Sequence, residues 1–226
     1  MSTITVLLAE DHAIVREGLS ALLKREADMQ VIGEAENGRQ AVALAAQLHP
    51  DVIVMDIAMP HLNGMEATRQ ILHDAPQSKV IILSAHSDDA YVEKVMSLGA
   101  SGYLIKQTAA HVLPEAIRRV HLGKKCFSPT IADRRKHHRQ RAHDRGELRT
   151  SKDAPVLTSR EVEVLQLIAE GRANKKSAQE LHISVKTIEK HRQSLMDKLN
   201  IHDTAGLTRH AIAVGMIESS VQVTIV

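Results

Sequence analysis

Cysteine and long apolar runs are scarce in this chain of 226 residues. The single cysteine, Cys126, excludes a disulfide within the chain. No apolar run approaches the roughly 20 residues that a membrane-spanning helix needs, and nothing supports peripheral binding to a membrane. The first apolar segment, 4–9, is shorter than the apolar region of a signal peptide and runs directly into two carboxylates. We therefore expect a cytoplasmic protein with no membrane partner.

Charge is almost balanced over the whole chain, at a formal +2, but it is unevenly distributed. Residues 1–123 carry 15 acidic and 10 basic side chains, residues 124–155 carry 4 and 10, and the remainder carries 8 and 9. Because the basic excess lies in the middle stretch, overall charge is weak evidence for nucleic-acid binding. These shifts and the change in pattern predict two domains. The predicted parts are a first domain over 1–123, a basic linker over 124–155, a second domain over 156–218 and a tail over 219–226.

The linker has too few aliphatic side chains to build a core. We interpret it as a flexible tether, and the alternative is an arm that contacts nucleic-acid phosphates without sequence preference. Its histidines His137, His138 and His143 lack a carboxylate or cysteine framework at metal-binding spacing. They do not predict a metal site.

Short aliphatic runs alternate with amphipathic stretches through residues 1–123. This pattern is typical of a parallel sheet with helices on both faces, and it predicts a doubly wound α/β domain of five βα units. The expected strands are 5–9, 31–35, 52–55, 80–83 and 102–105, and the expected helices are about 13–26, 38–48, 64–75, 90–98 and 111–122. A start of the last helix near His111 places Pro114 in its first turn, where a missing N–H costs little.

Reactive side chains follow four of the five predicted strands. Glu10 and Asp11 follow the first strand and Asp56 the third, while Ser84 and Lys106 follow the fourth and fifth. The carboxyl ends of parallel strands share one edge of a sheet, so these groups should converge there. Three clustered carboxylates repel one another and need a cation, which Lys106 and Mg²⁺ would supply. The arrangement predicts phosphoryl transfer to Asp56, with the Ser84 hydroxyl on a phosphoryl oxygen.

These residues resemble the receiver domain of bacterial response regulators over the whole of 1–123. The matching motifs are Glu10-Asp11, Asp56-x-x-Met59-Pro60-x-x-x-Gly64, Ser84-Ala85 and Tyr103-x-x-Lys106. The resemblance implies a flavodoxin-like fold and a partner sensor histidine kinase that phosphorylates Asp56. It also implies Mg²⁺ ligands at Asp11, Asp56 and the backbone carbonyl of Ala58, with Glu10 acting through water. Ser84 and Tyr103 would then form a switch that changes the domain surface on phosphorylation.

From residue 157 the pattern is entirely helical. Thr158 and Glu161 have the spacing of a capping box at the start of a helix that runs to about residue 170, where Gly171 ends it. A short helix over 175–181 and a tight turn lead into a long helix from 185 to about 199, and a last helix spans about 204–216. This order predicts an all-α domain with a helix-turn-helix.

The long helix of this second domain has two distinct faces. Its apolar stripe consists of Val185, Ile188, Leu195 and Leu199. The opposite face can enter a DNA major groove, where Lys190 and Gln193 would read base edges and Glu189 would accept from cytosine. The side chains expected on phosphates are Lys175, Lys186 and Thr187. A merely solvated charged face is the alternative reading.

The second domain resembles the LuxR-type DNA-binding domain over 157–217. The matching segments are Leu157-Thr-Ser-Arg-Glu-Val-Glu-Val-Leu, Glu170-Gly171, Ile183-Ser-Val-Lys-Thr-Ile-Glu-Lys-His191 and Lys198-Leu-Asn. Together the two resemblances indicate a response regulator of the NarL/FixJ family, which implies double-stranded DNA and RNA polymerase as partners and a homodimer on DNA. The last helix would form the dimer contact through Leu207, Ala211 and Val214. Packing of these three side chains in the core of their own domain is the alternative.

The leading hypothesis is a transcription regulator controlled by phosphorylation of Asp56, and not an enzyme with an external substrate. A phosphatase with an aspartate nucleophile would carry a second acid two residues later, where this chain has Ala58. Such an enzyme would also leave 157–217 without a role. A receiver that controls an RNA-binding or protein-binding module is the alternative.

Overall fold

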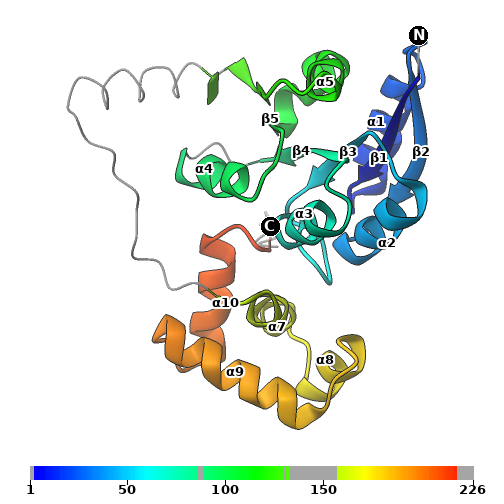
Figure 1. The fold of residues 1–226 in the computed structure, drawn as a ribbon. Coiled ribbons are helices and arrows are strands. Elements are labelled where there is room, and N and C mark those ends of the chain that lie inside the picture. Colours follow the sequence, from blue (N-terminus) through cyan, green and yellow to red (C-terminus); the bar gives the residue numbers. More distant parts are fainter. Residues whose placement is uncertain (1–2, 86–88, 130, 133–156, 218–226) are drawn as a thin grey trace, which may run out of the picture.

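The structure, a computed structural model, describes residues 3–85, 89–129, 131–132 and 157–217. Within these ranges the chain forms an N-terminal α/β domain and a C-terminal helical domain (Figure 1). Most of the predicted linker and the whole tail over 219–226 lie outside the described residues. No helix in the described part is long and apolar enough to cross a membrane.

The N-terminal domain is built on one parallel sheet. Its strands are β1 (Ile4–Ala9), β2 (Met29–Ala35), β3 (Val52–Asp56), β4 (Lys79–Ser84), β5 (Gly102–Ile105) and β6 (Cys126–Phe127). They lie in the order β2-β1-β3-β4-β5-β6, so the direction of strand succession reverses between β1 and β3. Strand β3 is buried along its whole length, which explains its unbroken aliphatic sequence. Ligands of such sheets bind at the carboxyl edge near this reversal point.

Helices cover both faces of the sheet. They are α1 (Ala13–Leu23), α2 (Gly38–Leu48), α3 (Gly64–Asp74), α4 (Asp89–Ser97) and α5 (Lys106–His121). One apolar cluster joins α2, α3 and α4 to the sheet, and a second joins α1 and α5 to its other face. The predicted doubly wound arrangement is therefore confirmed.

Helix α5 begins earlier than predicted. It starts at Lys106, five residues before His111, so Pro114 lies inside the helix and not in its first turn. The proline cannot donate a hydrogen bond to the carbonyl of Ala110. Burial of Leu113 and Ile117 against the sheet offsets this loss, since tertiary packing contributes most of the stability of a helix in a protein.

The N-terminal domain also continues past the predicted boundary at residue 123. Strand β6 pairs in parallel with the start of β5, the Ser128 hydroxyl accepts a hydrogen bond from the Ile105 N–H at 2.8 Å, and Ile131 is fully buried. Residues 124–129, 131 and 132 thus belong to this domain, and the linker begins later than expected. A strand of two residues is too short to show a period in the sequence.

The C-terminal domain contains α7 (Ser159–Ala169), α8 (Asn174–Glu180), α9 (Val185–Leu199) and α10 (Thr204–Ala213). The predicted capping box is present, since Thr158 Oγ1 accepts from the Glu161 N–H and Glu161 Oε2 accepts from the Thr158 N–H. The turn between α8 and α9 places His182 in the left-handed region, at φ 52°. Helices α9 and α10 pack on α7, which confirms the predicted helix-turn-helix domain. Helix α10 ends three residues earlier than predicted.

The two domains touch through α7. This helix lies against α3 and against the loop that joins β3 to α3, as the arrangement in Figure 1 shows. The loop, residues 57–63, directly follows Asp56. The contact between domains therefore lies beside the carboxyl edge of the sheet.

Candidate functional site

The predicted reactive groups meet at the carboxyl edge of the sheet. Asp56 ends β3 and is 2% exposed, and Glu10, which follows β1, is equally buried. The Nζ atom of Lys106, at the start of α5, lies 2.9 Å from Asp56 Oδ2 and 3.0 Å from Glu10 Oε2. The ends of three separate strands thus bring two carboxylates and one ammonium group into contact.

Four side chains at this edge form a set with metal-binding chemistry. One ligand atom from each of Glu10, Asp11, His12 and Asp56 lies within 4.8 Å of all the others. Lys106 is the ion-pair partner of the buried oxygens Glu10 Oε2 and Asp56 Oδ2, and His12 is the partner of Asp11 Oδ1. Carboxylate oxygens of this kind suit a hard divalent cation.

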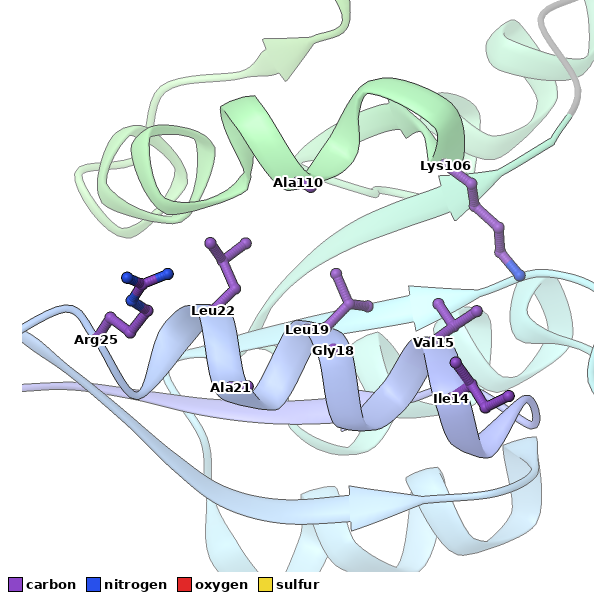
Figure 2. Close-up of a pocket in the computed structure, with 9 residues that line it drawn as sticks. All are labelled: Ile14, Val15, Gly18, Leu19, Ala21, Leu22, Arg25, Lys106 and Ala110. Carbon is purple, nitrogen blue, oxygen red and sulfur yellow. The ribbon is translucent and has the colours of Figure 1, made fainter.

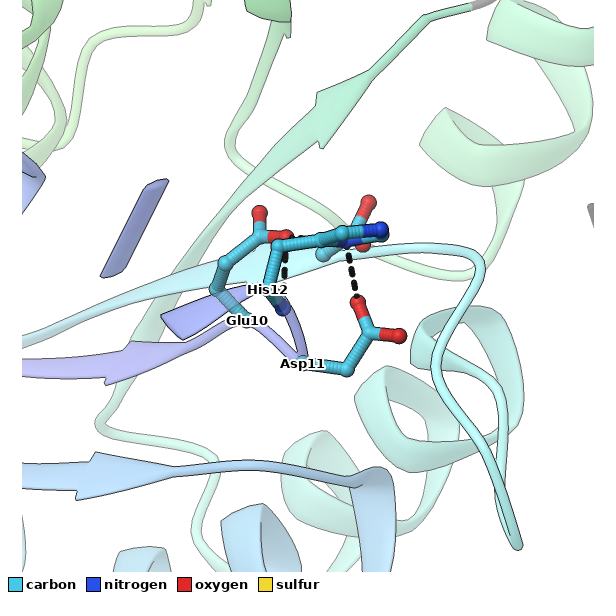
Figure 3. A group of neighbouring side chains, drawn as sticks. Glu10, Asp11 and His12 are labelled. Atoms are coloured by element: carbon cyan, nitrogen blue, oxygen red, sulfur yellow. Dashed lines mark hydrogen bonds and ion pairs between the residues drawn. The ribbon is translucent and has the colours of Figure 1, made fainter. Parts of the chain in front are cut away.

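His12 is the member of this set that the sequence reasoning missed. Its Nδ1 lies 2.8 Å from Asp11 Oδ1 and 3.1 Å from Glu10 Oε1. Figure 3 shows the three side chains, with dashed lines for the interactions between them. Burial alone would lower the pKa of His12, but the two carboxylates outweigh it and raise the pKa. The only sequence signal was its place directly after the acidic pair.

The pKa of Asp56 is shifted strongly by its surroundings. Burial and the nearby charge of Glu10 raise its pKa to about 6, although Lys106 and the Ile57 N–H act in the opposite direction. Burial would lower the pKa of Lys106, but its two carboxylate partners raise it, so this group stays a cation. A single ammonium group does not fully compensate the carboxylates, and an additional cation would stabilise the ionised form of Asp56.

The backbone around Asp56 is tightly packed. The Ile57 N–H donates to Asp56 Oδ1 at 2.7 Å, which orients the carboxylate. Gly64 begins α3 directly behind it, and a Cβ atom at Gly64 would lie 1.8 Å from the Asp56 carbonyl oxygen. Only glycine allows this approach of α3 to the end of β3. Ala58, the expected source of a carbonyl ligand, lies between them in the loop.

Ser84 and Tyr103, the predicted switch residues, are both buried. Ser84 ends β4 directly after Leu83, the residue that pairs with Asp56 of β3. It therefore lies one residue beyond the level of Asp56, at the same carboxyl edge of the sheet. Tyr103 lies in β5 and is fully buried in the apolar cluster under α2, α3 and α4. Their roles as a switch stay predictions.

The predicted DNA-contacting side chains lie on an open surface. Lys186, Glu189, Lys190 and Gln193 on α9 are exposed, and so is Lys175 at the start of α8. Thr187 is half-buried because it takes part in the cap of α9, where the Ser184 hydroxyl accepts from its N–H at 3.0 Å. The N-terminal domain therefore does not cover this face of α9. Val185, expected in the buried stripe, is instead 40% exposed because it is the first residue of the helix.

The residues expected to form a dimer contact pack instead against their own domain. Leu207 and Ala211 are fully buried in the core that α10 forms with α7, and Val214 packs against the edge of that core. The prediction that Leu207 and Ala211 meet a second copy is wrong for this arrangement, because their own domain covers them. The core-packing alternative describes both correctly.

A buried aspartate with an acidic pair and a lysine, set in a flavodoxin-like sheet and joined to an open helix-turn-helix, defines a two-domain signalling regulator. The family described as the response regulator receiver domain matches residues 6–118, and that described as bacterial regulatory proteins of the luxR family matches residues 155–211. The chain belongs to the response regulators with a LuxR-type DNA-binding domain. Residues up to 132 are called the receiver domain below, and residues 157–217 the effector domain.

Individual proteins show the same relationship over nearly the full chain. Response regulator protein VraR of Staphylococcus aureus is 36% identical over 216 residues, which cover 96% of this chain and all of that one. The RcsB response regulator of Salmonella typhimurium is similar at 26% identity and a TM-score of 0.62, over 95% of this chain and 99% of that one. A structure of an RcsB–DNA complex matches at 27% identity and a TM-score of 0.56, over 94% of this chain and all of that one.

Proposed function

We propose that this response regulator controls transcription by binding DNA after Asp56 accepts a phosphoryl group from a histidine of a partner sensor kinase. The observation that carries the proposal is the buried contact of Asp56 with Lys106 beside Glu10 and Asp11, in a chain that also has an exposed recognition face. An oxygen of Asp56 attacks phosphorus while the P–N bond to the donor imidazole breaks, and the released imidazole takes up a proton. Lys106 neutralises charge on the phosphoryl oxygens.

A divalent cation fits the carboxylates of the receiver site. Asp11, Asp56 and the backbone carbonyl of Ala58 would hold Mg²⁺, and Glu10 would act through water. When bound, the ion supplies positive charge that reduces repulsion between these carboxylates and the phosphoryl group. The clustering of these carboxylates and the raised pKa of Asp56 support this assignment. Ser84 would bond a phosphoryl oxygen, and Tyr103 would carry the change to the surface of α4 and β5.

A groove between α1 and α5 provides a surface for the kinase. It has a volume of about 440 Å³ and an apolar lining that includes Leu19, Leu22 and the 87% exposed Ile14 (Figure 2). Lys106 lines one end of the groove and also contacts Asp56. A kinase helix seated there would bring its phosphohistidine close to Asp56.

The effector domain would bind double-stranded DNA through α9. Lys190, Gln193 and Glu189 would contact bases, and Lys175, Lys186 and Thr187 would contact phosphates. The RcsB–DNA complex, and a structure described as two RcsB dimers bound to two parallel DNAs, support DNA over RNA as the target and a homodimer as the bound form. Since Leu207 and Ala211 are buried, the dimer contact would use the outward side of α10, where Arg209 and Ala213 are exposed. RNA polymerase would then be recruited or excluded at the promoter.

Genome-wide DNA binding of the wild type and of Asp56→Ala tests the site, the output and their coupling together. We expect phosphorylation-dependent occupancy of specific promoters in the wild type and loss of that dependence in the variant. Equal occupancy would contradict phosphorylation control. Salt-dependent binding of the purified protein to duplex DNA and to RNA separates the DNA-binding function from an RNA-binding one.

A further inference from the structure

Glu10, Asp11 and His12 follow one another in the sequence, and their side chains meet at the start of α1. His12 Nδ1 lies 2.8 Å from Asp11 Oδ1 and 3.1 Å from Glu10 Oε1. Figure 3 shows the ring directed at both carboxylates. Three consecutive residues thus bring two carboxylate oxygens and one imidazole nitrogen within contact distance.

The imidazole of His12 is not needed to hold the start of α1. His12 is the residue that caps this helix, but its side chain makes no capping hydrogen bond. Its N–H donates to Glu10 Oε1 at 3.3 Å, and its carbonyl accepts from the Arg16 N–H at 3.0 Å. The backbone of His12 therefore fixes the helix start, and the ring is left to contact the carboxylates.

Arg16 fixes the backbone that carries the acidic pair. Its Nη1 donates to the Glu10 carbonyl at 2.7 Å, and its Nη2 donates to Glu36 Oε1 at 2.9 Å. The Arg16 side chain is only 11% exposed. The end of β1 is thus tied to α1 and to the residue that follows β2. Ligands on a fixed backbone bind an ion with little loss of conformational freedom.

The spacing of the three ligand atoms fits direct binding of one ion. Neighbouring ligand atoms around a tetrahedral Zn²⁺ lie about 3.3 Å apart, since the zinc–nitrogen and zinc–oxygen bonds are about 2.0 Å long. The two His12 contacts, at 2.8 and 3.1 Å, are slightly shorter than this separation. An ion in place of the shared hydrogen therefore requires only a small outward movement of the ring, which is 55% exposed.

The site can be reached from one side. The side chains of His12 and Asp11 are 55% and 26% exposed, whereas that of Glu10 is 1% exposed. A cavity of about 230 Å³ lies beside Asp11 and His12, and the carboxylate-bearing Glu170 of α7 also lines it. This space can admit the ion and a water molecule that completes its coordination.

The imidazole distinguishes between two classes of cation. Mg²⁺ prefers oxygen ligands and keeps several waters, whereas Zn²⁺ binds imidazole nitrogen together with carboxylate oxygen. The ligands proposed for Mg²⁺, namely Asp11, Asp56 and the Ala58 carbonyl, include no nitrogen. Asp56 is also held by Lys106 at 2.9 Å. A set of ligands that includes His12 therefore favours zinc, and it shares Asp11 with the Mg²⁺ set.

We propose that Glu10, Asp11 and His12 form a zinc-binding site beside Asp56, in which His12 Nδ1 is the ligand that selects Zn²⁺ over Mg²⁺. The inference rests on the proposed function, which places Mg²⁺ on Asp11. The two ions compete, because both need the Asp11 carboxylate. The charge of Zn²⁺ together with that of Lys106 matches the three carboxylates at this edge of the sheet.

The test measures metal binding by the full-length protein without a phosphodonor. Zinc affinity is measured by competition with a chromophoric chelator, and Mg²⁺ affinity by isothermal titration calorimetry. Because the chain has 14 histidines, zinc is assigned to this site by the difference between variants. His12→Ala removes the imidazole, and His12→Gln removes it but keeps an N–H donor for the carboxylates. The matched control is His73→Ala, since His73 Nδ1 lies 2.7 Å from Asp74 Oδ1 on an exposed surface.

We expect both His12 variants to bind zinc at this site at least about tenfold more weakly than the wild type, because loss of a direct ligand costs more than loss of an outer-shell partner. Their Mg²⁺ affinity should change far less, and His73→Ala should bind zinc as the wild type does. Added Mg²⁺ should weaken zinc binding by the wild type. Equal losses of zinc and Mg²⁺ affinity in the His12 variants, or an unchanged zinc affinity, would overturn the inference.

Nitrogen-15 NMR of the histidine rings gives a second readout on the wild type. The His12 Nδ1 resonance, identified by its absence in His12→Gln, should shift when zinc is added. A resonance that stays in place while zinc binds would contradict a direct bond to His12. Phosphorylation of the wild type by acetyl phosphate, with Mg²⁺ and without zinc, tests the proposed function separately. Absence of phosphate on Asp56 would overturn that function, while the zinc measurements decide the inference.

Discussion

Lys106 Nζ lies 2.9 Å from Asp56 Oδ2, and this ion pair joins the first turn of α5 to the end of β3 at the buried edge of the sheet. The positive charge of Lys106 does not balance the negative charge around it, because Glu10 shares the same ammonium group and raises the pKa of Asp56. Binding of an additional cation at this site should therefore stabilise the receiver domain.

Asp56→Asn should stabilise the metal-free receiver at neutral pH. The pKa of Asp56 is about 6 in the fold against an ordinary 3.8, so folding favours its protonated form. Stability is therefore lost as pH rises from about 4 to about 6, and at neutral pH ionised Asp56 opposes folding by about 3 kcal/mol. Thermal unfolding without metal should show a higher Tm for the variant. Mg²⁺ should raise the Tm of the wild type more than that of Asp56→Asn, and a lower Tm for the metal-free variant would contradict the electrostatic argument.

Gly64→Ala should unfold or severely destabilise the receiver. The added Cβ atom would meet the Asp56 backbone oxygen at 1.8 Å, a contact that backbone atoms cannot avoid without moving α3. We expect a loss of more than about 3 kcal/mol. The matched control is Gly18→Ala in α1, where a Cβ atom meets nothing within 4 Å and should add about 0.5–1 kcal/mol through helix propensity. Similar urea midpoints for the two variants would rule out the close-packing explanation.

The effector domain should lose stability as pH falls from about 4.5 toward about 2. Burial would raise the pKa of Glu161, but hydrogen bonds from Lys198, Ser194 and Thr158 outweigh it and lower the pKa to about 2 from an ordinary 4.5. A lowered carboxyl pKa stabilises the fold above pH 4.5, and this contribution disappears as the group protonates. Glu161→Ala should cost about 3 kcal/mol at neutral pH and much less at low pH. Circular dichroism melts over this range test the slope, with exposed Glu189→Ala as the control.

Ile14→Asp should reduce phosphotransfer from the sensor kinase without affecting phosphorylation by acetyl phosphate. Ile14 is 87% exposed on the groove between α1 and α5, and its replacement removes apolar area that a partner helix would cover. We expect roughly a tenfold or greater loss of the kinase-dependent rate. Loss of both reactions to the same extent would place the defect in the receiver site itself.

Two lysines of the effector domain should affect DNA binding in different ways. Lys190→Ala should weaken binding to the specific operator by about 1–3 kcal/mol and relax base preference. Lys175→Ala should weaken binding to all duplexes alike and reduce the slope of log affinity against log salt by about one. Titrations at several salt concentrations with specific and random duplexes measure both effects. An identical pattern for the two variants would contradict the division between base and phosphate contacts.

Local patterns in the sequence were sufficient for much of the receiver site. Asp56 and Lys106 were placed together because each follows an aliphatic run, and parallel strands present their carboxyl ends at one edge. Longer-range packing overruled other expectations. Pro114 lies inside α5 because Leu113 and Ile117 are buried, and Leu207 serves the core of its own domain because α10 lies on α7.

The sequence by itself determined the presence of two domains, the order of the five βα units and of the four later helices, and the set of acidic and basic groups at Asp56, because hydrophobic period, capping and strand ends are local properties. Only the tertiary structure decided that His12 joins the acidic cluster and that Gln166 and Glu170 reach the receiver. Along α7 these two residues read as ordinary polar positions. Contacts with the other domain bury both residues and supply their hydrogen-bond partners. The pattern of residues within one helix does not indicate which surface that helix will contact.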